Sequence, residues 1–169
     1  DSYMRGANMA DIKIIVDSGS DIPQDIADKY NIGVISFLSI FGTEQYVQRT
    51  EITNEQFFNK LEEYDGIPTT SQTPFGDMLD YFKQQCEEHE SVIYFALSSA
   101  ASGQYQTANL VKSEIEEENP NADFHIVDSQ KFSLYIAQTA VHAAQMAKDG
   151  KSVDEIITEC EKYIKTVSY

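Results

Sequence analysis

Short runs of β-branched and aromatic residues alternate along this chain with longer segments of helical periodicity. The apolar runs bounded by turn residues predict buried strands at residues 12–16, 91–97 and 123–127. A further extended run covers residues 33–41, and Gly42-Thr43 turns it towards a hairpin partner at residues 45–47. The chain therefore contains several short strands separated by segments long enough for helices.

The segments between the strands carry helix start and stop signals. Residues 53–56 and 152–155 have the form of capping boxes, which open helices. Asp21 is placed to cap a short helix that ends at Tyr30. The remaining helices are predicted from Thr73-Pro74 onwards, over residues 102–118 and over residues 133–148. From Lys165 the pattern resembles the opening of another strand, so we interpret the chain as truncated at its carboxyl end.

Strands that alternate with helices indicate an α/β fold, with a mostly parallel sheet covered by helices on both faces. In such sheets ligands bind beyond the carboxyl ends of the strands. Residues 17–20, 98–103 and 128–129 all follow predicted strands. One crevice is expected to collect the three segments.

Two serine- and threonine-rich segments, residues 68–72 and 97–106, carry the most specific chemistry. Each is predicted to precede a helix, whose first N–H groups and dipole suit an anion. Hydroxyl donors without Lys or Arg favour a small, singly charged group such as a carboxylate. Simple helix capping is the competing explanation, and Gly103 either admits a ligand or serves packing.

Composition narrows the range of partners. The 169 residues fit one domain, which we place at residues 9–169, and we interpret residues 1–8 as a tag remnant or disordered start. A net charge of −16 argues against binding to nucleic acid or to an anionic membrane. No apolar run is long enough for a membrane span, and the predicted location is cytoplasmic. Cys86 and Cys160 are expected to be reduced core residues.

Catalytic and metal-binding motifs are not apparent. The sequence has no G-x-S-x-G, no phosphate-binding glycine motif and no metal-ligand spacing of Cys or His, so neither a metal nor another cofactor is predicted. Two alternatives to a binding protein remain open. One is an enzyme acting on a small phosphorylated or carboxylated substrate, which requires titratable groups in the crevice. The other is a regulatory domain whose serine loops only cap helices.

Taken in order, these segments resemble the DegV family of bacterial fatty-acid-binding proteins. The matching stretches are residues 15–21, 70–72, 97–106 and 126–129. The resemblance covers the family's amino-terminal α/β domain, so we interpret the chain as lacking the family's second domain. It implies a lipid-binding carrier rather than an enzyme.

The resemblance also implies roles for individual residues. The carboxylate of a long-chain fatty acid is expected to be held by Thr70 and Ser102, with Ser71, Ser99 and Gly103 completing the site. The carrier is expected to present the acid to a fatty-acid kinase, which forms the acyl-phosphate.

The chain departs from the family pattern at several positions near these residues. Thr73 stands where Pro usually follows Thr-Ser-Gln, and Gln104 replaces the Thr of Leu-Ser-Gly-Thr-Tyr. Gln48 occupies the position of a frequent Asp. Tyr135 and Ala137 replace glycines, and these larger side chains are expected to shorten the acyl tunnel or to block it.

Overall fold

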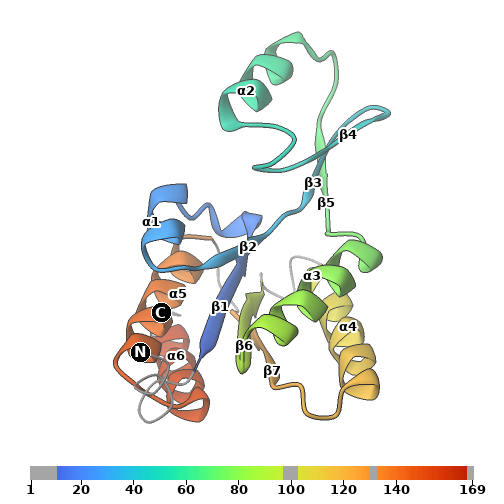
Figure 1. Cartoon of the computed structure of the whole chain (residues 1–169). Coiled ribbons are helices and arrows are strands. Elements are labelled where there is room, and N and C mark those ends of the chain that lie inside the picture. The colour runs from blue at the N-terminus through green and yellow to red at the C-terminus, as the bar shows by residue number, and fades with distance from the viewer. Residues whose placement is uncertain (1–10, 97–102, 130–132, 167–169) are drawn as a thin grey trace.

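The computed structural model describes residues 11–96, 103–129 and 133–166 of the chain. Its centre is a four-stranded parallel sheet in the order β2-β1-β6-β7 (Figure 1). The strands are β1 (Ile12–Asp17), β2 (Gly33–Ile35), β6 (Ser91–Ala96) and β7 (Phe124–Asp128). The predicted mostly parallel sheet is confirmed.

Helices cover both faces of this sheet (Figure 1). One face carries α3 (Phe75–Glu88) and α4 (Gln104–Glu118), and the other carries α1 (Gln24–Lys29), α5 (Ser133–Lys148) and α6 (Val153–Thr166). This arrangement follows from the continuous apolar strands, because a strand buried on both faces requires cover on both.

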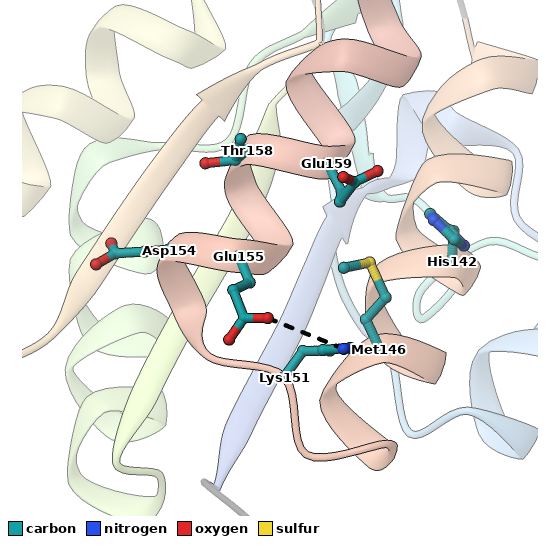
Figure 2. A pocket seen from close by; sticks show the side chains of 7 residues that line it. All are labelled: His142, Met146, Lys151, Asp154, Glu155, Thr158 and Glu159. Carbon is teal, nitrogen blue, oxygen red and sulfur yellow. Dashed lines mark ion pairs between the residues drawn. The ribbon is translucent and has the colours of Figure 1, made fainter.

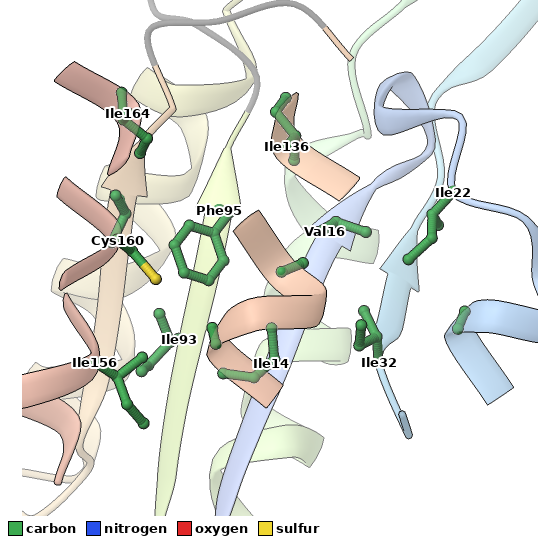
Figure 3. Close-up of a cluster of buried hydrophobic side chains, with 14 residues drawn as sticks. Ile14, Val16, Ile22, Ile32, Ile93, Phe95, Ile136, Ile156, Cys160 and Ile164 are labelled. Atoms are coloured by element: carbon green, nitrogen blue, oxygen red, sulfur yellow. The ribbon is translucent and has the colours of Figure 1, made fainter. Parts of the chain in front are cut away.

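Successive side chains of the central strands build two separate cores. Towards α5 and α6 they contribute a cluster that includes Ile14, Val16, Ile93 and Phe95 (Figure 3). Towards α3 and α4 they contribute Ile15, Val92, Tyr94 and Ala96. Full burial of a large apolar side chain stabilises the fold by about 1.5–3 kcal/mol, so these alternating positions fix the register of the sheet.

A lobe rises from the main body beyond the carboxyl end of the sheet (Figure 1). It contains β3 (Leu38–Phe41), β4 (Glu44–Val47) and β5 (Thr69–Ser71) in an antiparallel sheet of order β4-β3-β5, together with α2 (Asn54–Glu63). The β3–β4 hairpin confirms the predicted turn at Gly42, whose φ is 64°. The lobe as a second sheet was not predicted.

Three predictions about individual elements are wrong. The extended run at residues 33–41 is two strands in different sheets. Asp21 is not a helix cap: it has φ 53° and ends a 3₁₀ turn (Ser18–Ser20), and Pro23 precedes α1. Residues 165 and 166 continue α6 instead of opening a strand, because its amphipathic face extends to Ile164 in the core.

Both predicted capping boxes are confirmed. The Thr53 hydroxyl accepts from the Gln56 N–H at 3.1 Å, and the Gln56 side chain accepts from the Thr53 N–H at 2.9 Å. Ser152 and Glu155 make the corresponding pair at the start of α6. Cys86 and Cys160 are free thiols, as expected.

Candidate functional site

The carboxyl edge of the parallel sheet collects two of the three predicted strand-end segments. Asp17 ends β1 and Asp128 ends β7, on either side of β6. Asp17 is fully buried, and its Oδ2 accepts from the Tyr94 hydroxyl at 3.0 Å. Burial and the charge of Asp17 raise the pKa of Tyr94 well above its usual value, so its hydroxyl stays a neutral donor.

Of the third segment, the described residues begin at Gly103. Ser99 and Ser102 lie outside the described residues. Gly103 is the N-cap of α4 and has φ −74° and ψ −3°, a conformation open to any residue. A reason for glycine at position 103 must therefore come from the atoms around it and not from its backbone angles.

Thr70 and Ser71 lie in strand β5, which corrects their predicted place at a helix start. Thr70 stands opposite Ser39 and Ser71 opposite Leu38 on the antiparallel neighbour β3. The following helix begins only at Phe75, with Pro74 before it. Thr70 is exposed and Ser71 half-buried. Helix capping therefore does not explain Thr70, and Thr70 does not lie at the start of α3.

The structure brings the end of β5 against the start of α4. A Cβ placed on Gly103 would meet the side chain of Gln72, with the Gln72 Cδ only 3.4 Å away and its Oε1 closer still. A larger residue at position 103 would have to displace the end of the Gln72 side chain, which occupies this space. The two serine- and threonine-rich segments, thirty residues apart in the sequence, thus meet through Gln72 and Gly103.

A second contact between the same segments was not foreseen from the sequence. The Thr73 N–H donates to Gln104 Oε1 at 3.0 Å, and Gln104 Nε2 donates to the Thr73 hydroxyl at 3.0 Å. That hydroxyl donates in turn to the Ser36 carbonyl at 2.8 Å. Both side chains are buried. In the sequence they are marked only by their polar character, with Thr73 directly after one serine- and threonine-rich segment and Gln104 within the other.

A third set of hydrogen bonds joins the lobe to the main body through Gln48 and Ser39, the residue opposite Thr70. Ser18 donates to Gln48 Oε1 at 2.8 Å, and Gln48 Nε2 donates to the Ser39 hydroxyl at 3.0 Å. The Ser18 hydroxyl also accepts from the Phe37 N–H at 2.8 Å. Gln48 supplies one donor and one acceptor between two hydroxyls, a role that an ionised Asp is unable to fill because it only accepts.

Comparison with known proteins identifies the family. A profile described as an uncharacterised protein, DegV family, matches residues 11–169. The chain belongs to the DegV family. A DegV domain-containing protein of Clostridium perfringens is 34% identical over 152 residues, which cover 88% of this chain and 52% of the relative. The protein DegV of Bacillus subtilis is 29% identical over 157 residues, covering 92% of this chain and 54% of its own length.

Solved DegV structures have the same fold. The crystal structure of DegV from Bacillus subtilis, described as a fatty acid binding protein, superposes with a TM-score of 0.84 at 28% identity. A DegV family protein from Thermus thermophilus, described by its fatty acid binding, gives 0.80 at 27% identity. Both comparisons cover 92% of this chain and 54% of the solved one. The chain thus spans about half the length of the relatives that it matches.

Charge is distributed unevenly among the helix starts. The first turns of α1, α2, α3 and α6 carry acidic residues, whereas those of α4 and α5 carry none. These two helices are the ones that follow β6 and β7 at the carboxyl edge. In a chain with a net charge of −16, the first turns of these two helices thus carry no acidic side chain that would offset the positive end of the helix dipole.

Histidines, the usual general bases, lie away from this edge. His89 and His125 pair with Asp11 and Asp123 near the amino ends of β6 and β7. His142 lies on the surface of α5, beside a hollow of about 550 Å³ between α5 and α6 (Figure 2). Among the described residues no group of His, Cys, Asp and Glu is arranged to hold a metal ion. The described helices include none that is long and apolar enough to cross a membrane.

A larger hollow of about 760 Å³ opens between the lobe and the main body. Its walls include Ile22, Ile52 and Phe57, and Ser39 contributes to its lining. Ser39 is the residue opposite Thr70, so the hollow begins one strand away from the Thr70 position. The long apolar cavity leading to Thr70 that the resemblance implies stays a prediction.

Proposed function

We propose that this chain binds a long-chain fatty acid, with its carboxylate between strand β5 and the start of α4. The hydroxyls of Thr70 and Ser102 and the first amides of α4 are the donors in this proposal, with Ser71, Ser99 and Gly103 around them. One observation carries it: Gln72 lies against Gly103, so the two hydroxyl-bearing segments are neighbours.

The chemistry of these donors suits a carboxylate. Hydroxyls and amides bind a single negative charge through hydrogen bonds, which are about twice as strong with an ionised partner as with a neutral one. The first turn of α4 adds a positive dipole end without an acidic side chain. A phosphate, with its greater charge, is more often met by Arg or Lys, and neither occurs in residues 68–76 or 97–111.

The relatives support the class of ligand. Solved DegV proteins at 27–28% identity, from Bacillus subtilis and Thermus thermophilus, are described as binding fatty acids. An acyl chain contributes about 0.8 kcal/mol for each buried CH₂. Most of the affinity therefore comes from the chain, and the carboxylate contacts set its orientation and add about 1.5–3 kcal/mol per charge-assisted bond.

We further propose that the chain is a carrier and leaves the chemistry to a fatty-acid kinase. Thr70 is exposed, so a carboxylate bound there remains accessible to a second protein. The described histidines lie away from this position and offer no general base for a reaction at the carboxylate. Because a kinase takes its phosphoryl group from ATP, we propose that the carrier and the kinase meet in the cytoplasm.

Native mass spectrometry of freshly purified protein tests this function directly. We expect a population whose added mass equals that of one fatty acid, and we expect that population to shrink in a Thr70→Val variant. The contrary result is a protein that carries no such adduct and takes up none when incubated with palmitate.

A further inference from the structure

The junction between β5 and α3 is fastened to the first residue of α4 by one side chain. Gln104 has no exposed surface, and its amide contacts Thr73 twice, once through Oε1 to the backbone N–H and once through Nε2 to the hydroxyl. A side-chain amide suits this task because it offers an acceptor and a donor side by side. Loss of either contact leaves a buried polar group unsatisfied, which is strongly unfavourable.

Gln104 is itself held from the sheet. Its side chain lies near the hydroxyl of Tyr94 on β6 and acts to lower the pKa of that group, and the Tyr94 hydroxyl donates to Asp17 at the end of β1. Tyr94 and Asp17 are both fully buried. The Gln104 amide therefore lies against buried residues of the sheet, and we expect it to position the segment around Thr73.

The same contact reaches the lobe. Thr73 donates its hydroxyl to the Ser36 carbonyl, between β2 and β3, so Gln104 secures the point at which β5 leaves the main body. Thr70 lies on β5, three residues before Thr73, and Ser102 lies two residues before Gln104 in the sequence. A displacement of Thr73 away from Gln104 thus moves the end of strand β5 away from the start of α4.

We propose that Gln104 is a positioning residue, which sets the separation between strand β5 and the start of α4 that a single carboxylate requires. This inference rests on the proposed function, since it concerns the same site. It adds a buried residue that is not expected to touch the ligand but determines whether Thr70 and the first amides of α4 converge on it.

A comparison of two ligands separates positioning from a merely structural role. Dodecanoate and 1-dodecanol share the same chain, but only the first carries a carboxylate. Isothermal titration of the parent and of Gln104→Met, which keeps the length of the side chain without its polar atoms, provides the affinities. We expect Gln104→Met to weaken dodecanoate binding about tenfold and to change dodecanol binding less than twofold.

Two further variants complete the experiment. Gln106→Met replaces an exposed glutamine in the same helical turn and is expected to leave both affinities unchanged. Thr73→Val keeps the backbone N–H but loses the hydroxyl, and it is expected to reduce dodecanoate binding selectively even if Gln104→Met fails to fold. The double variant is expected to lose less affinity than the product of the two single losses, because both single variants remove the bond from Gln104 Nε2 to the Thr73 hydroxyl.

The outcomes distinguish the two proposals. A parent that binds no dodecanoate contradicts the proposed function and this inference with it. A parent that binds dodecanoate, with variants that keep the same affinity or lose acid and alcohol by equal factors, overturns the positioning role alone.

Discussion

Ser39 and Thr70 stand directly opposite each other on strands β3 and β5. Directly opposed residues project from the same face of a sheet, so the two hydroxyl-bearing side chains are neighbours. Ser39 is buried and accepts a hydrogen bond from Gln48, whereas Thr70 is exposed. Thr70 is therefore the exposed member of this pair of hydroxyl-bearing residues, and its hydroxyl does not cap a helix.

Gly103→Ala tests whether the contact with Gln72 matters for binding. The new Cβ displaces the Gln72 side chain, which is exposed and able to move, so we expect stability to change by about 0.5 kcal/mol or less. Fatty-acid affinity is expected to fall several-fold, because the end of β5 no longer lies against α4. Urea unfolding and isothermal titration measure the two effects.

Gly76→Ala is the matched control for this change. Gly76 lies in α3, and a Cβ there meets no atom within 4 Å. Alanine in a helix is better than glycine by about 0.5–1 kcal/mol, so this variant is expected to be more stable with unaltered affinity. Equal affinities in both glycine variants would show that the Gln72 contact has no part in the site.

The contact between Gln72 and Gly103 could not be predicted from the sequence, because the two residues are far apart along the chain. The strands, most helices and both capping boxes were predictable because each is encoded by local periodicity and by residues three or four apart. The lobe was not, since β5 is only three residues long and its pairing with β3 is a long-range contact. Its shortness also led to Thr70 being assigned to a helix start.

The candidate site was predictable in its segments but not in its geometry. Thr73 and Gln104 appear in the sequence as two unrelated departures from the family pattern, and in the structure they are hydrogen-bond partners. A proline at position 73 has no N–H to donate, so the amide of Gln104 has a use only when another residue stands there. Such a pair is recognisable only when the two segments are seen side by side.

Acid stability is expected to depend on Asp123. Burial acts to raise the pKa of this carboxyl, but hydrogen bonds from Ser91 and His125 outweigh it and the pKa is lowered. A folded-state pKa below the unfolded value of about 3.9 means that the carboxylate stabilises the fold above that pH. The contribution is lost as the pH falls through the folded pKa.

Asp123→Asn tests this dependence by urea unfolding between pH 7 and pH 3. The variant is expected to be less stable than the parent at pH 7, and the difference is expected to shrink towards pH 3. Ser91→Ala, which removes one donor, is expected to move the Asp123 pKa upwards in an NMR titration. A difference in stability that is constant over the whole range would contradict the assignment.

Tyr135 is expected to limit the acyl chains that the protein accepts. It is half-buried in the first turn of α5, at a position where the family usually has glycine, and its carbonyl accepts from the Thr139 hydroxyl at 2.6 Å. Tyr135→Gly is expected to admit longer or bulkier acids, because it removes a large side chain at the start of the helix that follows β7. The lipids recovered with parent and variant, identified by mass spectrometry, measure the change.

His142→Gly controls for the backbone effect of glycine in the same helix. His142 is exposed, so the variant is expected to lose about 1 kcal/mol of stability from helix propensity alone and to keep the lipid profile of the parent. If Tyr135→Gly also recovers an unchanged profile, Tyr135 lies away from the acyl chain.

The most direct measurement is isothermal titration of palmitate into the parent, Thr70→Val and Ser102→Ala, with a thermal melt of each. A charge-assisted hydrogen bond is worth about 1.5–3 kcal/mol and each 1.4 kcal/mol is about a factor of ten, so each variant is expected to bind about tenfold to a hundredfold more weakly. Thr70 caps no helix, and the melting temperature of its variant is expected to stay unchanged. Unchanged affinity in both variants would contradict the carboxylate site, and a loss of about 1 kcal/mol of stability in Ser102→Ala would then indicate that Ser102 is a helix cap.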